Sequence, residues 1–243
     1  MNLGDFFAGL SYGELNNIKV GMEGEGAIDP TDQARVTHYT NSALTLLHSK
    51  FSHKQDYVNI KLIAGRKKYP LRTVHNVSNL DPGNTEDRFI QDSTTDQYAG
   101  DLIKIISVVA QPTADEPDVD PYEVVLNNTE ADAPFRTTTF DTLYIEEPVV
   151  DQILTIEYQV NHSKLTMPPN LLQEIELAPV LHEALEAKVA ARVYGTMNGE
   201  AHIMKSQLLN AQFEEICALV KQEDLLQETR TALHSKFSDR GFV

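Results

Sequence analysis

The chain has 243 residues, of which 41% are hydrophobic, so it can bury a core in one large domain or two small ones. Its formal net charge of −16 argues against a protein that grips nucleic acid, because that function needs a basic surface to release counterions. The single cysteine, Cys217, excludes an intrachain disulfide, and the apolar runs are too short to span a bilayer.

The N-terminal part of the chain is predicted to be helical. Residues 3–10 indicate a short apolar helix, and Ser11 followed by Glu14 has the spacing of a capping box that would begin a second short turn. Asp29 as N-cap, with proline at the first helical position, predicts a longer helix over Pro30–Lys50. The N-terminal stretch has neither a basic start nor a long apolar segment, so we expect no secretory signal.

The middle of the chain alternates strand patterns with polar turns, and no helical pattern lies between them. The first two strands are separated by a short turn and are expected to pair as a hairpin, whereas residues 76–100 are expected to form a long polar loop. Antiparallel strands without intervening helices predict a small sandwich or barrel-like module. The predicted strands cover residues 57–63, 68–74, 102–110, 122–126, 137–145 and 153–160.

A helical pattern returns after the last strand. Leu181, Leu185, Val189 and Val193 recur every four residues, which predicts a helix with one apolar face. A glycine-containing break at 195–199 separates it from a second helix over residues 200–222. Such a short connection predicts that the two helices pack as an antiparallel hairpin.

These patterns together predict an α+β fold. A helical bundle, made of the N-terminal helices and the C-terminal helical hairpin, would carry an inserted antiparallel β sandwich or barrel-like module and end in an extended C-terminal arm. The expected parts are 1–54 for the N-terminal helices, 55–165 for the β module, 166–224 for the helical hairpin and 225–243 for the arm.

Charge is unevenly distributed along the chain. Residues 48–75 carry seven Lys and Arg against one Asp, a net charge of +6, whereas residues 86–130 carry a net charge of −9. These two regions are either solvated surfaces or complementary edges of neighbouring subunits in a self-assembling ring. The second interpretation predicts subunit contacts through Arg66, Lys67 and Lys68 on one side and Asp115, Glu116 and Asp118 on the other.

No catalytic or metal-binding motif is recognisable. His182, Glu183 and Glu186 lack the second histidine that a zinc-binding HExxH helix requires. The acidic stretch 115–120 lacks the glycine and the distal glutamate of a calcium loop, and it is interrupted by proline. We therefore predict no catalytic residues, no metal site and no cofactor, and the missing motifs lower the odds of an enzyme without excluding one.

Three stretches carry a resemblance to a known family. They are LGDFFAGLSYGELNNI at 3–18, the helix at 30–50 running into YVNIKLIAGRKKYPL at 57–71, and TLYIEEPVVDQILTIEYQVNHSKL at 142–165 followed by PPNLLQEIELAPVLHEALEAKVAARVYG at 168–195. In this order they resemble the head-to-tail adaptor (connector) proteins of tailed bacteriophages.

The resemblance implies a structural virion protein with no catalysis and no membrane contact. Such a protein assembles in the host cytoplasm into a ring of about twelve copies. The ring docks below the portal protein, joins it to a tail or nozzle protein, and lines a channel through which DNA passes without specific binding.

The family's flexible C-terminal arm reaches the portal, and this carries over to residues 225–243 here. The arm is richer in basic residues than the rest of the chain, which suits wrapping around a partner. Phe237 and Phe242 would supply buried area, and Arg240 would donate to a portal carboxylate. The expected portal-binding residues are Arg230, Lys236, Phe237, Arg240 and Phe242.

Two alternative functions remain open from the sequence. One is a different ring of the virion, such as a neck or tail-completion protein. The other is an enzyme or a small-molecule-binding module built on the β part, which would need a concave, partly apolar pocket with convergent polar groups.

Overall fold

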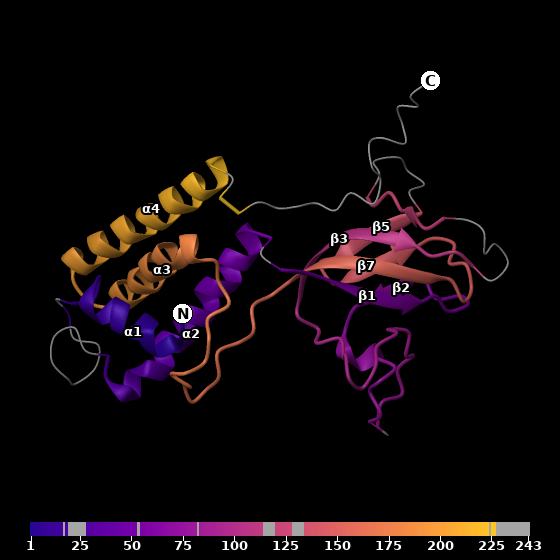
Figure 1. Cartoon of the computed structure of the whole chain (residues 1–243), viewed down its shortest axis with the longest axis horizontal. Helices are drawn as coiled ribbons and strands as arrows, with labels where there is room; N and C mark the ends of the chain where they lie inside the picture. The colour runs from indigo at the N-terminus through magenta and orange to yellow at the C-terminus, as the bar shows by residue number, and fades with distance from the viewer. Residues whose placement is uncertain are drawn as a thin grey trace. The chain divides into compact units, whose positions relative to one another are not determined.

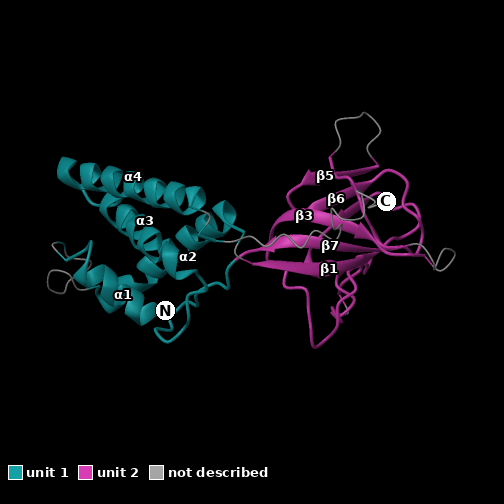
Figure 2. Ribbon diagram, turned by 45° about the horizontal axis from the view of Figure 1, so that its top comes forward, with its two compact units in different colours: residues 1–53, 162–228 teal, residues 54–161, 229–243 magenta. Residues whose placement is uncertain are grey.

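The computed structural model divides into two compact units, each with its own apolar core (Figure 2). Unit 1 is built from the described residues within 1–53 and 162–228, and unit 2 from those within 54–161. Unit 1 is helical and unit 2 holds two antiparallel sheets, so the fold is α+β (Figure 1). The structure describes residues 1–16, 18, 28–52, 54–81, 83–113, 120–127, 134–223 and 225–226.

The first two helices of unit 1 begin at side-chain caps. Asn2 Oδ1 accepts the N–H of Asp5 at 2.7 Å, and Asp29 Oδ1 accepts the N–H of Thr31 at 2.9 Å. None of the described helices is long and apolar enough to cross a lipid bilayer. The helices are α1 (Leu3–Tyr12), α2 (Pro30–Lys50), the short 3-10 helix η2 (Pro179–Leu181), α3 (His182–Gly195) and α4 (Glu200–Gln222).

Helix α3 is the central helix of unit 1. It contacts α1, α2 and α4, and three consecutive residues, Val189, Ala190 and Ala191, are at most 1% exposed. Three neighbours in sequence point in three directions around a helix, so α3 is buried on more than one side. Helix α4 lies beside it and buries one stripe, which consists of Leu209, Phe213, Cys217 and Val220 (Figure 1).

The larger sheet of unit 2 has the order β1-β7-β3-β4, and the smaller sheet has the order β2-β6-β5. Strands β7 and β3 are the two inner strands of the larger sheet, because β7 pairs antiparallel with β1 and β3, and β3 pairs antiparallel with β7 and β4. The strands are β1 (Gln55–Lys61), β2 (Lys68–Pro70), β3 (Leu102–Ala110), β4 (Tyr122–Glu123), β5 (Phe135–Thr139), β6 (Thr142–Ile145) and β7 (Ile153–Val160), with the 3-10 helix η1 (Thr73–His75) after β2.

One apolar cluster collects side chains from both sheets. Alternate residues of β7, such as Leu154 and Ile156, are fully buried in it together with Leu143 of the smaller sheet. The described residues of the long segment over 76–100 form no helix or regular strand, yet the segment contributes Phe89 and Ile90 to the same cluster. This segment is therefore part of the unit's core, although its polar composition predicted a loop.

Two strand predictions were wrong. The predicted hairpin does not form, because β1 pairs with β7 over seven residue pairs, and β2 pairs with β6. Strand β2 is only three residues long and ends in Pro70, which has no N–H for a ladder, so β7 offers β1 the longer match. The predicted strand at 137–145 is two strands, because the chain turns at Phe140 and Asp141.

Two smaller predictions at element ends also differ from the structure. The predicted strand at 122–126 is limited to Tyr122–Glu123. Ser11 does not cap a second turn but lies within α1, which ends when the N–H of Gly13 donates to the carbonyl oxygen of Gly9 at 2.8 Å.

Candidate interaction surface

Two of the three predicted contact cations are paired within their own unit. Arg66 Nη1 lies 2.7 Å from Asp87 Oδ2, and Lys67 Nζ lies 2.7 Å from Glu146 Oε1. Lys68 is exposed and forms no ion pair with another described residue. Of the other predicted site residues, Asp115, Glu116, Asp118, Arg230, Lys236, Phe237, Arg240 and Phe242 lie outside the described residues.

The start of α3 carries His182, Glu183 and Glu186. His182 Nε2 lies 3.3 Å from the carbonyl oxygen of Leu177. Burial raises the pKa of the Glu186 carboxyl, and the nearby charges of Glu183 and Glu14 raise it further. No group of three or more His, Cys, Asp or Glu side chains able to hold a metal ion occurs among the described residues.

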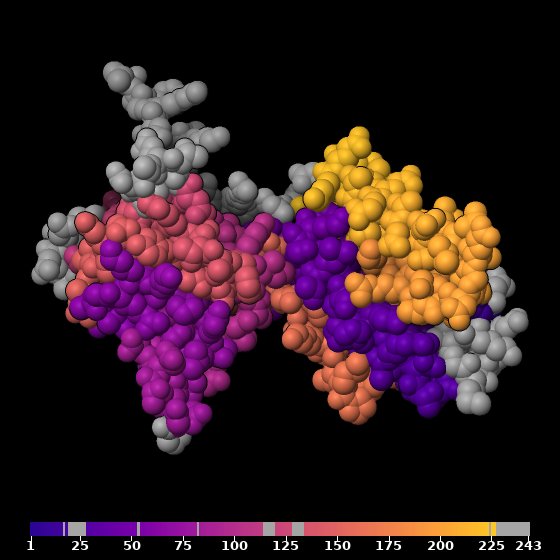
Figure 3. All heavy atoms as spheres, turned by 180° about the vertical axis from the view of Figure 1, so that it is seen from behind, coloured from indigo at the N-terminus to yellow at the C-terminus, as the bar shows by residue number. Residues whose placement is uncertain are grey.

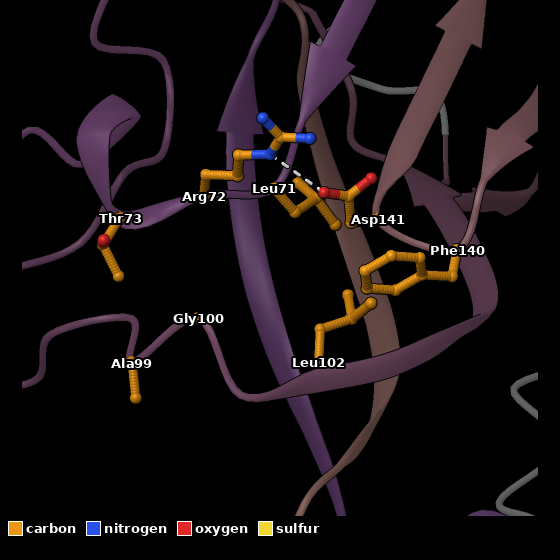
Figure 4. A pocket seen from close by; sticks show the side chains of 8 residues that line it. All are labelled: Leu71, Arg72, Thr73, Ala99, Gly100, Leu102, Phe140 and Asp141. Carbon is orange, nitrogen blue, oxygen red and sulfur yellow. Dashed lines mark hydrogen bonds and ion pairs between the residues drawn. The ribbon is translucent and has the colours of Figure 1, made fainter.

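A cavity of about 270 Å³ opens beside the turn between β5 and β6 (Figure 4). Its walls are polar and apolar in about equal parts, and the ring of Phe140, which is 65% exposed, lies near Leu102. The two charged residues at its edge bind each other, since Arg72 Nε lies 2.9 Å from Asp141 Oδ2. The lining residues are Leu71, Arg72, Thr73, Ala99, Gly100, Leu102, Phe140 and Asp141.

The Asp141 side chain forms hydrogen bonds within the turn between β5 and β6. Its Oδ1 accepts hydrogen bonds from the hydroxyls of Thr139 at 2.7 Å and Thr142 at 2.9 Å. Burial by itself would raise the pKa of this carboxyl, but the hydrogen bonds from Thr139, Arg72 and Thr142 outweigh burial and lower it. The polar groups at this cavity therefore satisfy one another and do not converge on a ligand.

A second cavity in unit 2, of about 150 Å³, is lined mainly by polar residues. Asp101 lies in its wall, where burial raises the pKa of the carboxyl and the hydroxyl of Tyr158 counteracts part of this rise. Asp101 Oδ1 has no hydrogen-bond partner among the described residues. Asp56, Asp92 and Asp96 also line this cavity, but no group of carboxylates among the described residues is arranged to hold a metal ion.

Among the described helices, α4 carries the largest number of exposed large apolar side chains. Met204, Leu208 and Leu219 are 64%, 61% and 50% exposed. At 100° per residue, this face lies opposite the buried stripe of the same helix. We call the exposed face the α4 stripe, and it consists of Ala201, Met204, Leu208, Ala211, Ala218 and Leu219.

Between Ala201 and Leu219, one charged residue, Glu215, lies within the arc of the α4 stripe. It is exposed, and it forms no ion pair with any described residue. By contrast, Glu214 and Lys205 beside the stripe are paired within unit 1, with Lys50 and with Glu14. Figure 3 shows α4, in orange to yellow, as a continuous part of the surface of unit 1.

The sequence analysis missed this surface, although its spacing is readable. Positions 201, 204, 208, 211, 215 and 218 alternate steps of three and four, which is the spacing of a helix that packs against another apolar surface. Leu209 and Phe213 form another apolar face with helical spacing, so the sequence alone does not show which face of this helix is exposed.

Comparison with known proteins adds no assignment: no family model matches the chain, and no curated protein matches it in a sequence search.

Proposed function

We propose that this chain is a structural subunit of a bacteriophage head-to-tail adaptor ring, without enzymatic activity. The observation that carries the proposal is that α4 is apolar on two opposite faces. One face packs in the core of unit 1, and the other is exposed in the single chain. A helix that is apolar on both sides is expected to be covered on both, and assembly covers the second side.

The order of elements supports the same function. Helices α1 and α2 precede the β unit, and α3 and α4 follow it, which is the order that the resembling stretches predicted. In the proposed subunit, unit 1 is the helical bundle of the ring, and unit 2 is an inserted β sandwich. The ring docks below the portal protein and joins it to a tail or nozzle protein.

The net charge supports a channel protein. A charge of −16 on each copy would give a ring of about twelve copies a strongly negative surface. Such a surface repels phosphate, so DNA passes through the channel without being held.

Size-exclusion chromatography with light scattering tests the proposal, first with the chain alone and then with its cognate portal protein. We expect a ring that forms alone or on the portal, and that binds the portal. A ring that ignores the portal would favour a neck or tail-completion protein instead. A chain that stays monomeric alone and with the portal would overturn the proposal.

A further inference from the structure

A second exposed apolar surface of unit 1 lies in the turn that precedes η2. Met167, Leu171 and Leu172 are 51%, 40% and 82% exposed. We call these three residues the turn patch. Because exposed apolar side chains that cluster locally mark contact sites more often than isolated ones, this patch is a second candidate for a protein partner.

The turn patch is held by hydrogen bonds on both of its sides. The N–H of Gly4 donates to the carbonyl oxygen of Leu171 at 2.9 Å, which ties the turn to α1. The side chain of Gln173 closes the turn, since its Oε1 accepts the N–H of Thr166 at 2.9 Å and its Nε2 donates to the carbonyl oxygen of Lys164 at 3.0 Å. The patch is therefore presented in a defined geometry, which lowers the entropy cost of covering it.

The charges beside the two surfaces are opposite. Glu215 lies within the α4 stripe, and Lys164 lies three residues before Met167. Both side chains are exposed, and neither forms an ion pair with a described residue. Opposite charges at the edges of an apolar contact fix its orientation and exclude wrong partners.

We propose that the α4 stripe of one copy covers the turn patch of the next copy, with Glu215 paired to Lys164 across the contact. In Figures 1 and 3, α4 and the segment that carries the turn lie on opposite sides of unit 1. Two different surfaces on opposite sides give a head-to-tail contact, which closes into a ring when the rotation between copies allows it. The inference rests on the proposed ring only in requiring that copies of the chain associate.

A symmetric contact between two α4 stripes explains less of the structure. It would bring Glu215 of each copy towards the apolar stripe of the other, and it would leave the turn patch exposed. It would also end at a dimer, because each copy would have used its single stripe.

Complementary variants of the full chain test the proposed contact. Leu208→Glu disables the stripe, and Leu172→Glu disables the turn patch. Ile203→Glu serves as the control, because Ile203 is 51% exposed on the same helix but lies outside the stripe. Each variant is analysed by light scattering alone and in an equimolar mixture, after circular dichroism has shown an unchanged helix content.

We expect wild type and Ile203→Glu to form the ring, and each disabled variant to be monomeric alone. The mixture should stop at a dimer, because one intact stripe meets one intact turn patch and no further contact is possible. If Leu172→Glu still self-associates while Leu208→Glu is monomeric, the contact is symmetric and the inference is wrong. Rings in both disabled variants overturn the inference and leave the proposed function standing, whereas a monomeric wild type, alone and with portal, overturns both.

A charge exchange gives a second test that does not add charge to an apolar residue. Glu215→Lys and Lys164→Glu should each weaken self-association by up to about fivefold, and the double variant should restore it. If the single variants self-associate like wild type, or if the double variant associates no more tightly than the single variants, Glu215 and Lys164 do not pair across the contact.

Discussion

The imidazole rings of His48 and His162 lie 5.7 Å apart between centroids, and both residues are buried in unit 1 at 2% and 4% exposure. His162 Nε2 lies 3.0 Å from the carbonyl oxygen of Asn41, and its Nδ1 lies 3.0 Å from that of Ser163. Burial lowers the pKa of His162, and the neighbouring His48 lowers it further. The two carbonyl contacts and the charge of Glu176 favour the protonated ring, but only partly offset the lowering.

Unit 1 is therefore expected to lose stability when the pH falls below the ordinary histidine value of 6.5. The unfolded chain takes up the proton at that pH, whereas folded His162 takes it up only at its lowered pKa, so protonation favours unfolding. The free energy of unfolding, measured in urea between pH 7.5 and 5, should fall over this window. His162→Gln should flatten this part of the curve, and His38→Gln, on the exposed side of α2, should not.

Two adjacent leucines of α4 are expected to respond in opposite ways. Leu209 is fully buried, so Leu209→Ala should lower the free energy of unfolding by about 2–5 kcal/mol through the cavity it leaves. Leu208 is 61% exposed, so Leu208→Ala should change it by less than about 0.5 kcal/mol while reducing self-association. Urea unfolding of monomer and light scattering at assembly concentrations measure the two effects, and an equal loss of stability in both variants would contradict the assignment of faces.

Among the three predicted contact cations, Lys68 is the one expected to act between subunits. Lys68→Glu should weaken ring formation at low salt by up to about fivefold and have no effect near 1 M salt. Arg66→Glu is the comparison, because it also breaks the pair with Asp87 inside the unit. If Lys68→Glu assembles like wild type at low salt, the basic region at 48–75 takes no part in the contact between subunits.

The C-terminal arm is expected to bind the portal without stabilising the isolated subunit. Leu226 packs against the core of unit 1, although the arm was predicted to begin at residue 225, so the informative truncation ends after Leu226. That truncation should shift the melting temperature by no more than about 2 °C and abolish portal binding. A large fall in melting temperature with binding retained would show that the arm belongs to the fold.

The sequence predicts the local secondary structure better than it predicts which strands pair. The bounds of α2, β3 and β7 agree with the predicted segments, because caps and periodicity are properties of neighbouring residues. Strand partners depend on distant residues, so alternation in 57–63 revealed a buried face but not that β7 would cover its edge. The turn at Phe140 and Asp141 was hidden because threonines on both sides continue a strand pattern.

The candidate surfaces show the same limit. The spacing of the α4 stripe is present in the sequence, but only the fold reveals which of the two apolar faces of α4 is already covered. Likewise, the sequence does not show that Arg66 is paired, because its partner Asp87 lies in the distant segment over 76–100. The turn patch has no periodic signal, because it lies in an irregular segment.

The chain enters and leaves unit 2 at adjacent points, since the N–H of Val160 donates to the carbonyl oxygen of Lys54 at 2.9 Å. The first and last residues of the β unit thus lie side by side, as they do in a domain that is inserted into a surface loop of another domain. Joining the chain on the two sides of the β unit with a short glycine-rich linker would close a small loop at little entropic cost. A helical protein with unit 2 excised and this linker in its place would show whether ring assembly resides in unit 1 alone.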